Sequence, residues 1–297
     1  IEDARRARVR FASECLTFAN VPEDDLLPSF LAEGQSPIVS ARWKERACKD
    51  NGAGWDFDDV RDHYVATLFG VDPVRVRYEN MERYLYLGRV ATGEVMARVF
   101  AEFRRAGSTT AGGLVWFLQD LWPGPGWGIL DSRGLPKSPY WFLKRVLQPL
   151  ALFITDEGVN GLRIHLVNDA AEDVAGTLRL ALHRHGEVRT AEGAIEVVVR
   201  ARSKIEISGD GLLETFADTT RAYRFGPPGH DVAIATLSAP GEAGALLAQG
   251  VHLPGFGSPA PCIGLEGSLS RGPDGALVAT VTTRTFAHAV SLAVPNH

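Results

Sequence analysis

The sequence predicts a multidomain protein in which an α/β region, residues 1–149, is followed by an all-β region. Two observations support this division. The clearest helical patterns and all six tryptophans lie before Pro149. After it, short segments alternate apolar and polar residues and are separated by Gly, Asn and Asp, which is the pattern of strands joined by tight turns. At 297 residues the chain is long enough for two domains.

Three segments of the first region have helical signatures. Residues 55–70 begin with acidic side chains, which favour a helix N-terminus, and end at a glycine. Residues 81–107 repeat an apolar residue at every fourth position, the spacing of one ridge of an amphipathic helix. The members of this ridge are Ala91, Val95, Val99 and Phe103. Residues 136–148 predict a third helix, which ends before Pro149.

Two apolar runs of the first region predict strands, Val9–Ala12 and Leu114–Leu118. The second run has no alternation, which is typical of a strand buried on both faces in a parallel sheet. A Pro- and Gly-rich loop, residues 123–126, follows it. The order of strands and helices predicts a β/α repeat, with helices outside a parallel sheet and polar residues at the carboxyl ends of the strands.

Beyond Pro149, four segments predict a β-sandwich of about a hundred residues. Their apolar residues recur at every second position: Leu162, Ile164 and Leu166; Leu178, Leu180 and Leu182; Ile195, Val197 and Val199; and those of "HDVAIATLS". The Pro- and Gly-rich stretch 252–261 predicts a linker. The residues after it begin another β unit, but they are too few for a self-sufficient sandwich.

Composition excludes several classes of function. A formal net charge of -5 without a Lys/Arg run argues against nucleic-acid binding. No stretch approaches the ~18 consecutive apolar residues of a membrane span, and no signal peptide is visible. The widely spaced Cys15, Cys48 and Cys262 favour unpaired thiols in a reducing compartment, so we expect a cytoplasmic location. His183 and His185 have no third ligand in view, and we expect them at a strand surface and no metal site.

Glu14 follows the first predicted strand, in the stretch "RFASEC". A glutamate in this position is more often solvated or ion-paired than catalytic. However, a carboxylate at the carboxyl end of a barrel strand points into the mouth where β/α enzymes hold substrate. A retaining glycosidase uses such a carboxylate as its nucleophile, with an acid/base partner about 5 Å away. Both interpretations stay open on these residues alone.

The segment "VWFLQDLWPGPGW" carries a cluster of aromatic and polar side chains. Trp116 is either a core residue or a flat apolar surface for a pyranose ring. Asp120 can hydrogen-bond sugar hydroxyls together with Gln119, or it can cap the loop. Trp122, like Trp127, either wedges the loop in place or forms a wall of a cleft.

These residues resemble the β-mannosidases of glycoside hydrolase family 2. "RFASEC…P" is similar to their nucleophile strand, which reads close to RFxSE(Y/F)G, and residues 112–149 resemble their eighth barrel strand and helix, with its WQLND-x-WP motif. The "LVND…GTL" stretch is similar to the immunoglobulin-like domain that follows the barrel there. The resemblance covers nearly the whole chain in order, and the eighth-strand motif is its most specific part.

The resemblance implies a domain organisation. Residues 1–149 would be the C-terminal part of a (β/α)8 catalytic barrel, residues 150–258 an immunoglobulin-like β-sandwich, and residues 259–297 the truncated start of a second one. The family's acid/base glutamate follows an asparagine on an earlier strand, and the sequence contains no Asn-Glu dipeptide. We therefore expect that glutamate, the remainder of the barrel and the N-terminal domains on upstream sequence.

The resemblance also implies the site residues. Glu14 aligns with the nucleophile, Trp116 with the tryptophan that lines the sugar pocket, and Asp120 and Trp122 with the Asp and Trp that follow it. The implied function is a retaining hydrolase that removes terminal β-mannosyl residues from oligosaccharides without a metal or an organic cofactor. Four residues differ from the family motifs, but the nucleophile and Trp116 match them. The differing residues are Cys15, Leu16, Phe117 and Gln119.

Two alternatives remain open at the level of the sequence. Other family 2 exo-β-glycosidases, which act on β-glucosaminides, β-galactosides or β-glucuronides, share the barrel signature. A non-catalytic fragment or degenerate homologue, whose β-sandwiches serve docking or glycan binding, also fits a chain that carries half of a catalytic site. An upstream Asn-Glu pair would favour the enzyme over this second alternative.

Overall fold

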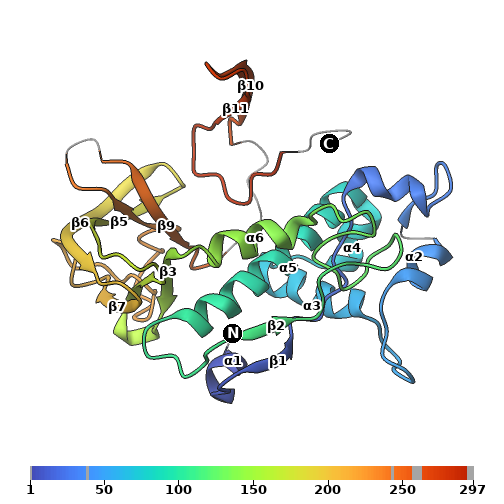
Figure 1. The fold of residues 1–297 in the computed structure, drawn as a ribbon, viewed down its shortest axis with the longest axis horizontal. Helices are drawn as coiled ribbons and strands as arrows, with labels where there is room; N and C mark the ends of the chain where they lie inside the picture. Colours follow the sequence, from blue (N-terminus) through green and yellow to red (C-terminus); the bar gives the residue numbers. More distant parts are fainter. Residues whose placement is uncertain (1, 38–39, 242–243, 256–262, 293–297) are drawn as a thin grey trace. The chain divides into compact units, whose positions relative to one another are not determined.

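The computed structural model describes residues 2–37, 40–241, 244–255 and 263–292 (Figure 1). The chain divides into two compact units, Ile1–Ala151 and Leu152–His297, and each is described by itself. None of the helices in the described ranges is long and apolar enough to cross a membrane.

Unit 1 contains six α-helices and two short strands within the described residues. The helices are α1 (Glu2–Ala7), α2 (Ala41–Arg46), α3 (Phe57–Phe69), α4 (Pro73–Glu79), α5 (Met81–Arg104) and α6 (Ser138–Val146). The strands are β1 (Ala12–Cys15) and β2 (Gly113–Val115), and a 3₁₀ helix spans Asp24–Ser29.

The three predicted helices are confirmed as α3, α5 and α6, and their ends have identifiable causes. Asp56 caps α3 in a capping box with Asp59, and the helix stops at Gly70, whose φ of 62° is left-handed and suits glycine. The Asn80 side chain accepts a hydrogen bond from Arg83 N (2.9 Å) and begins α5. The predicted ridge of α5 is buried along its whole length.

The strands of unit 1 differ from the sequence prediction. β1 and β2 pair in parallel, as expected, but β1 begins at Ala12, where Val9–Ala12 was predicted. The prediction that Leu114–Leu118 is buried on both faces is wrong, since Leu114 is 57% and Leu118 64% exposed. Among the described residues β1 and β2 pair only with each other. An apolar run is buried only where another part of the protein covers it. The described residues contain no surface that covers Leu114 and Leu118.

In the described part of unit 2 there are two main sheets and a separate hairpin. The first sheet has the order β3 (Leu150–Asp156), β4 (Leu162–Asn168), β7 (Ser203–Ser208). The second has the order β6 (Val188–Val199), β5 (Val174–Arg184), β8 (Val232–Ser238), β9 (Leu246–His252), and all of its pairs are antiparallel. The hairpin joins β10 (Glu266–Arg271) and β11 (Leu277–Thr282).

Aliphatic side chains form the core of unit 2. The predicted alternation is confirmed on β4 and β5, whose inward residues are at most 1% exposed. They are Leu162, Ile164, Leu166, Leu178, Leu180 and Leu182. A Cβ on Gly209, just after β7, would lie 3.2 Å from a methyl group of Leu180 on β5, so the two sheets approach closely there. On β6 the pattern weakens, because Ile195 lies on an edge strand and is 47% exposed.

Several minor predictions can also be placed. Cys15 and Cys48 are free thiols, and Cys262 lies outside the described residues, as does most of the predicted linker 252–261. His183 lies on β5 and His185 in the turn after it. Within the described ranges no group of three or more His, Cys, Asp or Glu residues could hold a metal ion.

Candidate active site

Glu14 and the residue after β2 come together at one edge of the β1–β2 pair. Trp116 N donates a hydrogen bond to Cys15 O (3.0 Å), and Ala12 N donates to Gly112 O (3.0 Å). Because the strands are parallel, their carboxyl ends lie at the same edge (Figure 1). Glu14 on β1 and Trp116 after β2, about a hundred residues apart in sequence, are therefore neighbours at this edge.

Both of these side chains are accessible. Glu14 is exposed, and its carboxylate makes no hydrogen bond or ion pair with any other described residue. Trp116 is 43% exposed. Next to Glu14, the Cys15 thiol donates to Leu114 O (3.4 Å) and so reinforces the strand pairing. The strand end thus presents an unpaired carboxylate and an indole to a ligand.

An aromatic row (Trp55, Phe57, Trp127 and Trp116) supports the Trp116 indole. The ring centroids of Trp116 and Trp127 lie 6.3 Å apart, those of Trp127 and Phe57 5.2 Å, and those of Phe57 and Trp55 5.4 Å. All three contacts are edge-to-face, a favourable arrangement for aromatic pairs. The row connects the Trp116 indole to the start of α3 and leaves part of that indole open to solvent.

The Asp120 carboxylate is turned into the loop that carries Trp122 and Trp127. Asp120 is 5% exposed; one of its oxygens accepts a hydrogen bond from Gly128 N (2.7 Å), and the other forms an ion pair with Lys137. A Cβ on Gly126 would come within 2.3 Å of Asp120 Oδ1, so only glycine fits there. Of the two roles that the sequence left open, these contacts favour holding the loop over direct contact with a ligand.

Lys137 lies beneath this loop and is completely buried. Besides Asp120, its ammonium group donates to Asn20 O (3.1 Å) and Gly126 O (3.2 Å). The Asn20 side chain in turn donates to the carbonyl oxygens of Trp127 (3.0 Å) and Gly128 (3.2 Å). The segment that follows β1 is thereby connected to the loop that follows β2.

Burial shifts the pKa values of both members of this ion pair. It raises the pKa of Asp120, although the charge and hydrogen bond of Lys137 oppose the rise. It lowers the pKa of Lys137, against the opposing charge of Asp120. The charge of each partner thus offsets part of the burial cost of the other, and removing one leaves an uncompensated buried charge.

Trp122 lies apart from the aromatic row. It is 51% exposed, and the guanidinium carbon of Arg46, the last residue of α2, sits 5.6 Å from the centre of its ring. A Cβ on Gly124 would be 2.4 Å from Arg46 Cβ, so the absence of a side chain there lets α2 approach the loop. No ring contact joins Trp122 to Trp116 among the described residues. Trp122 is an exposed rim residue of this loop.

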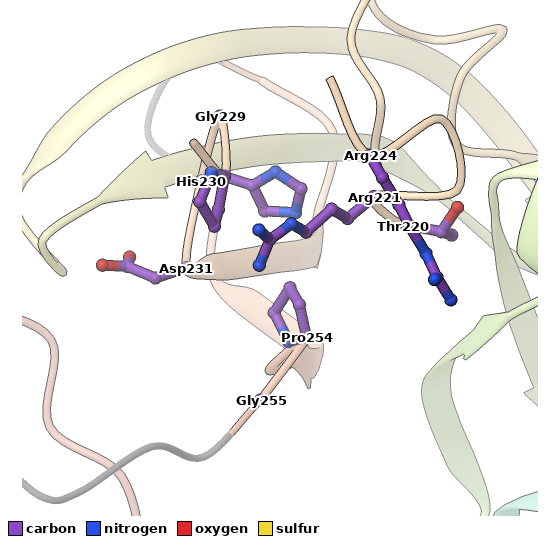
Figure 2. Close-up of a pocket in the computed structure, with 9 residues that line it drawn as sticks. Thr220, Arg221, Arg224, Gly229, His230, Asp231, Pro254 and Gly255 are labelled. Carbon is purple, nitrogen blue, oxygen red and sulfur yellow. The ribbon is translucent and has the colours of Figure 1, made fainter. Parts of the chain in front are cut away.

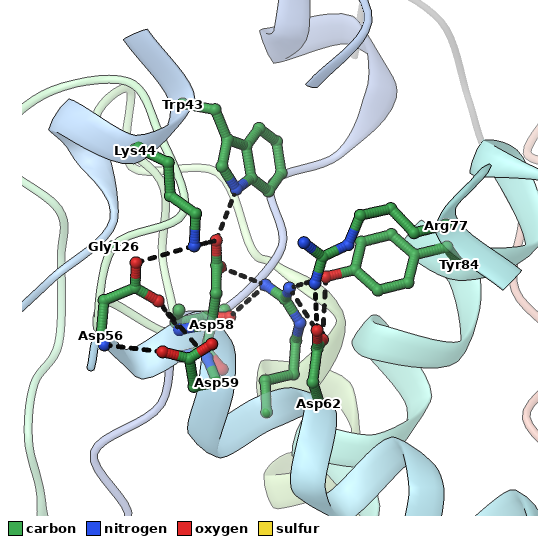
Figure 3. Close-up of polar contacts among 12 residues, drawn as sticks. Trp43, Lys44, Asp56, Asp58, Asp59, Asp62, Arg77, Tyr84 and Gly126 are labelled. Carbon is green, nitrogen blue, oxygen red and sulfur yellow. Dashed lines mark hydrogen bonds and ion pairs between the residues drawn. The ribbon is translucent and has the colours of Figure 1, made fainter. Parts of the chain in front are cut away.

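A second buried polar network supports the same segment from the other side (Figure 3). Arg61 of α3 is fully buried and binds Asp58 (2.7 Å) and Asp62 (3.3 Å). Arg61 also donates to Ala19 O (3.3 Å), in the segment after β1, and to the Tyr84 hydroxyl of α5 (2.5 Å). The network therefore ties α3 and α5 to the chain that leaves β1.

Ionic partners decide the protonation of the carboxylate at the centre of this network. Burial disfavours the charged form of Asp58, but the nearby charges of Arg61 and Lys44 outweigh it, and the pKa of Asp58 lies below its ordinary value. Trp43 Nε1 adds a hydrogen bond to the same carboxylate (2.8 Å; Figure 3). Asp58 is thus an ionised, fully paired group that joins α2 to α3.

The sequence analysis missed the residues that position the site. Lys137 and Asn20 were not singled out, and neither was Arg61, although its acidic neighbours Asp58 and Asp62 on the same predicted helix are a usable signal of an ion pair. Nothing local marks Asn20, since its partners are backbone carbonyls more than a hundred residues away. Trp55 and Phe57 lay inside a helix signature and gave no separate signal.

Comparison with known proteins relates this geometry to one group of enzymes. No family model matches the chain. β-Mannosidase B of Emericella nidulans is 26% identical over 180 residues, which are 54% of this chain and 21% of that protein. β-Mannosidase B of Aspergillus niger is 35% identical over 102 residues, which are 33% of this chain and 12% of that protein.

Solved structures show the same relationship at the level of the fold. The β-D-mannosidase of Dictyoglomus thermophilum matches with a TM-score of 0.77 at 20% identity, covering 99% of this chain and 33% of that one. The exo-chitosanase CsxA of Amycolatopsis orientalis matches with a TM-score of 0.57 at 13% identity, covering 90% and 33%. The chain thus spans about a fifth or less of these curated relatives and a third of these structures. The resemblance predicted from the sequence is confirmed: the chain is similar, over nearly all of its length, to part of β-mannosidase-like proteins.

Proposed function

We propose that the protein to which this chain belongs is a retaining glycoside hydrolase that removes terminal β-mannosyl residues, and that Glu14 is its nucleophile. One observation carries the proposal: an exposed, unpaired carboxylate and a braced, half-exposed indole share the carboxyl edge of a parallel strand pair. This is the edge at which β/α enzymes hold their substrates. The β-mannosidases to which the chain is similar support the class of reaction.

In the proposed reaction the Glu14 carboxylate attacks the anomeric carbon, and the bond to the leaving-group oxygen breaks as the glycosyl-enzyme ester forms. A second glutamate, on upstream sequence, protonates the departing oxygen. The same glutamate then removes a proton from water, which attacks the anomeric carbon and releases Glu14 as carboxylate. Neither step requires a metal or an organic cofactor.

The other site residues have distinct proposed roles. Trp116 offers its indole face to the apolar face of the sugar ring, and the aromatic row keeps that face in position. Trp122 forms part of the wall at the rim of the sugar pocket. Asp120 acts on the substrate through the loop, because its carboxylate is enclosed by Gly128 and Lys137.

We further propose that residues 1–149 are the C-terminal part of a (β/α)8 barrel, that residues 150–258 form an immunoglobulin-like sandwich, and that residues 259–297 begin a second one. The open edges of the β1–β2 pair support the assignment of residues 1–149 to a barrel, because a closed barrel leaves no strand edge unpaired and the missing strands would pair with these edges. The exposed Leu114 and Leu118 support it as well, as apolar side chains that the remaining barrel would cover. The paired sheets of unit 2 support the sandwich.

The test is the substitution Glu14→Gln in the full-length protein, assayed on an aryl β-mannoside. Removing a nucleophile should lower kcat by roughly 10⁴-fold or more, while circular dichroism stays unchanged. Glu45→Gln is the matched control, because Glu45 is an equally exposed glutamate of unit 1 with no partner among the described residues. Near-normal turnover by Glu14→Gln would refute the assignment.

A second candidate sugar follows from the fold match to an exo-chitosanase. An exo-β-glycosidase that acts on glucosaminides, galactosides or glucuronides would use the same nucleophile and the same tryptophan. A panel of aryl β-glycosides decides between them, and we expect the highest kcat/KM on the mannoside. Loss of all activity from the intact wild-type protein would instead favour a non-catalytic binding role.

A further inference from the structure

Unit 2 contains a cavity that is remote in sequence from the Glu14 edge. The cavity has a volume of about 630 Å³ and lies between the loop that joins β7 to β8 and the segment just after β9 (Figure 2). Its walls include Thr220, Arg221, Arg224, His230, Asp231 and Pro254. The volume falls in the range of small-molecule binding sites.

Two arginines supply positive charge to this cavity. Arg221 and Arg224 are exposed, and neither guanidinium makes a hydrogen bond or an ion pair with another described residue. In Figure 2 the Arg221 side chain reaches across the cavity toward His230, while Arg224 extends along the opposite side. A guanidinium presents a planar fork of donors, which suits two oxygens of a carboxylate or a phosphate.

The nearby carboxylates are committed to the backbone. Asp231 accepts hydrogen bonds from the amides of His185 (2.6 Å) and Gly186 (3.1 Å), and its side chain points away from Arg221 (Figure 2). Asp218 accepts from the amides of Ala222 (2.8 Å) and Tyr223 (3.0 Å). Neither carboxylate forms an ion pair with the arginines among the described residues, so both guanidinium groups are available to a ligand.

His230 adds an unfilled polar position to the wall. The residue is 5% exposed, and its Nε2 atom has no hydrogen-bond partner among the described residues. Buried polar atoms of folded proteins are almost always hydrogen-bonded, so an orphaned ring nitrogen beside a cavity indicates a missing partner. Burial lowers the pKa of His230, and at neutral pH the ring is therefore uncharged and able to hydrogen-bond a hydroxyl group.

We propose that this cavity binds an oxyanion, a carboxylate or a phosphate, carried on a compact hydroxylated molecule such as a sugar acid or a sugar phosphate. Arg221, which reaches toward His230, holds the oxyanion, Arg224 adds positive charge from the opposite side of the cavity, and His230 binds a neighbouring hydroxyl. The cavity is larger than a bare ion needs, which favours an anion on a scaffold. The site is independent of the proposed hydrolysis, because every residue that forms it belongs to unit 2 whereas Glu14 belongs to unit 1.

The experiment is isothermal titration calorimetry of the full-length protein with glucuronate, mannose 6-phosphate, inorganic phosphate and glucose. We expect binding of both anionic sugars, weaker binding of inorganic phosphate and no binding of glucose. Arg221→Gln should weaken the binding of the anionic sugars about 10- to 100-fold, since it removes charged hydrogen bonds, and Arg224→Gln should weaken it less, since it removes only a nearby charge. Glycosidase activity of the two variants should stay at the wild-type level.

Arg202→Gln is the matched control. Arg202 is also an exposed arginine of unit 2, with a left-handed backbone (φ 52°) like Arg221 (φ 55°) and Arg224 (φ 56°), but it does not line the cavity. Its substitution should leave the affinities unchanged. The proposal is overturned if no anion binds, or if Arg202→Gln weakens binding as much as the cavity variants do. Equal affinity for inorganic phosphate and for the anionic sugars would overturn the assignment of a scaffolded ligand.

Discussion

The two units differ in the largest side chains that they bury completely. In unit 1, two of the largest fully buried residues are Arg61 and Lys137, and they hold Asp58 and Asp120 in ion pairs. In unit 2 the largest fully buried side chains are all aliphatic, as on β4 and β5. Buried ion pairs cost several kcal/mol of desolvation per charge and are at best weakly stabilising. Their contacts in unit 1 instead determine where the segments after β1 and β2 lie.

The difference between an aliphatic core and buried ion pairs shows which part of the molecule needs a precisely fixed arrangement of side chains. An aliphatic core tolerates many packings of similar volume, whereas a lysine that binds one carboxylate and two carbonyls accepts a single arrangement. Lys137 holds the loop that carries Trp127, whose ring contacts Trp116, through such specific contacts. All six tryptophans lie in unit 1, so tryptophan fluorescence of the 297-residue chain follows that unit alone. The predictions for Lys137 and Asp58 use this probe to test the contrast.

The largest effect is expected for Lys137→Met. It leaves the buried Asp120 carboxylate without its cation, which should lower the free energy of unfolding of unit 1 by about 3–5 kcal/mol in urea titrations followed by tryptophan fluorescence. Lys144→Met is the control, because Lys144 is exposed and only overlies the Trp141 ring; it should cost less than about 1 kcal/mol. Equal losses in the two variants would contradict a positional role for Lys137.

A somewhat smaller effect is expected in the aliphatic core of unit 2. Leu180→Ala should lower the free energy of unfolding by about 2–5 kcal/mol, because Leu180 is fully buried and a cavity remains. The change should appear in far-ultraviolet circular dichroism. Leu246→Ala, on the same sheet but 59% exposed, should cost little. If both substitutions destabilise equally, the aliphatic residues of β5 are not the core of unit 2.

Acid should weaken unit 1 through Asp58. The pKa of this carboxyl is lower in the folded protein than its ordinary value of 3.8, so its stabilising contribution is present above that value and is lost as the pH falls through the folded pKa. Urea midpoints followed by tryptophan fluorescence should therefore lose this contribution only as the pH falls toward and below the ordinary value of 3.8. The Asp58→Asn variant should be less stable at neutral pH, and its urea midpoint should fall less steeply with decreasing pH than that of the wild type. If the two proteins show the same dependence of the midpoint on pH, Asp58 is not the cause of the acid sensitivity.

The smallest effect concerns chemical reactivity beside the Lys137–Asp120 pair. Burial, with a smaller contribution from the charge of Asp120, raises the pKa of the Cys48 thiol to about 11, and the thiolate is the reactive form. Alkylation of Cys48 by iodoacetamide, mapped by mass spectrometry, should stay slow until the pH approaches that value. Alkylation near neutral pH at the rate of free cysteine would show that partial burial beside the pair does not raise the pKa of the Cys48 thiol.

Three of the six helices in the described part of unit 1 and the core of unit 2 were predictable from local patterns, whereas α1, α2 and α4 were not predicted. The acidic start and glycine stop of α3, the four-residue ridge of α5 and the two-residue alternation on β4 and β5 are each readable from neighbouring positions. The apolar run Leu114–Leu118 led to a wrong prediction. An apolar sequence shows that a strand favours burial, but it does not show whether a neighbouring segment covers that strand. Leu114 and Leu118 are exposed because no described segment covers them.

The two ends of the candidate site were also named from the sequence, but its supports were not. Glu14 and Trp116 stand out as motif residues, and the structure brings them to one edge through the pairing of β1 with β2. Whether Asp120 meets a ligand or holds the loop was undecided until its contacts with Gly128 and Lys137 were seen. Contacts between residues so far apart in sequence leave no periodic pattern.

By itself, therefore, the sequence determined α3, α5 and α6, the alternation on β4 and β5, the resemblance to β-mannosidases and the choice of Glu14 as the candidate nucleophile. Periodicity and short motifs encode these features, because each depends on residues a few positions apart. Only the tertiary structure decided that Asp120 belongs to the interior, that Lys137 and Asn20 join the two strand-following segments, and that Arg221, Arg224 and His230 share one cavity. These features arise where distant segments meet, and there burial and charge pairing, rather than local spacing, determine what a residue does.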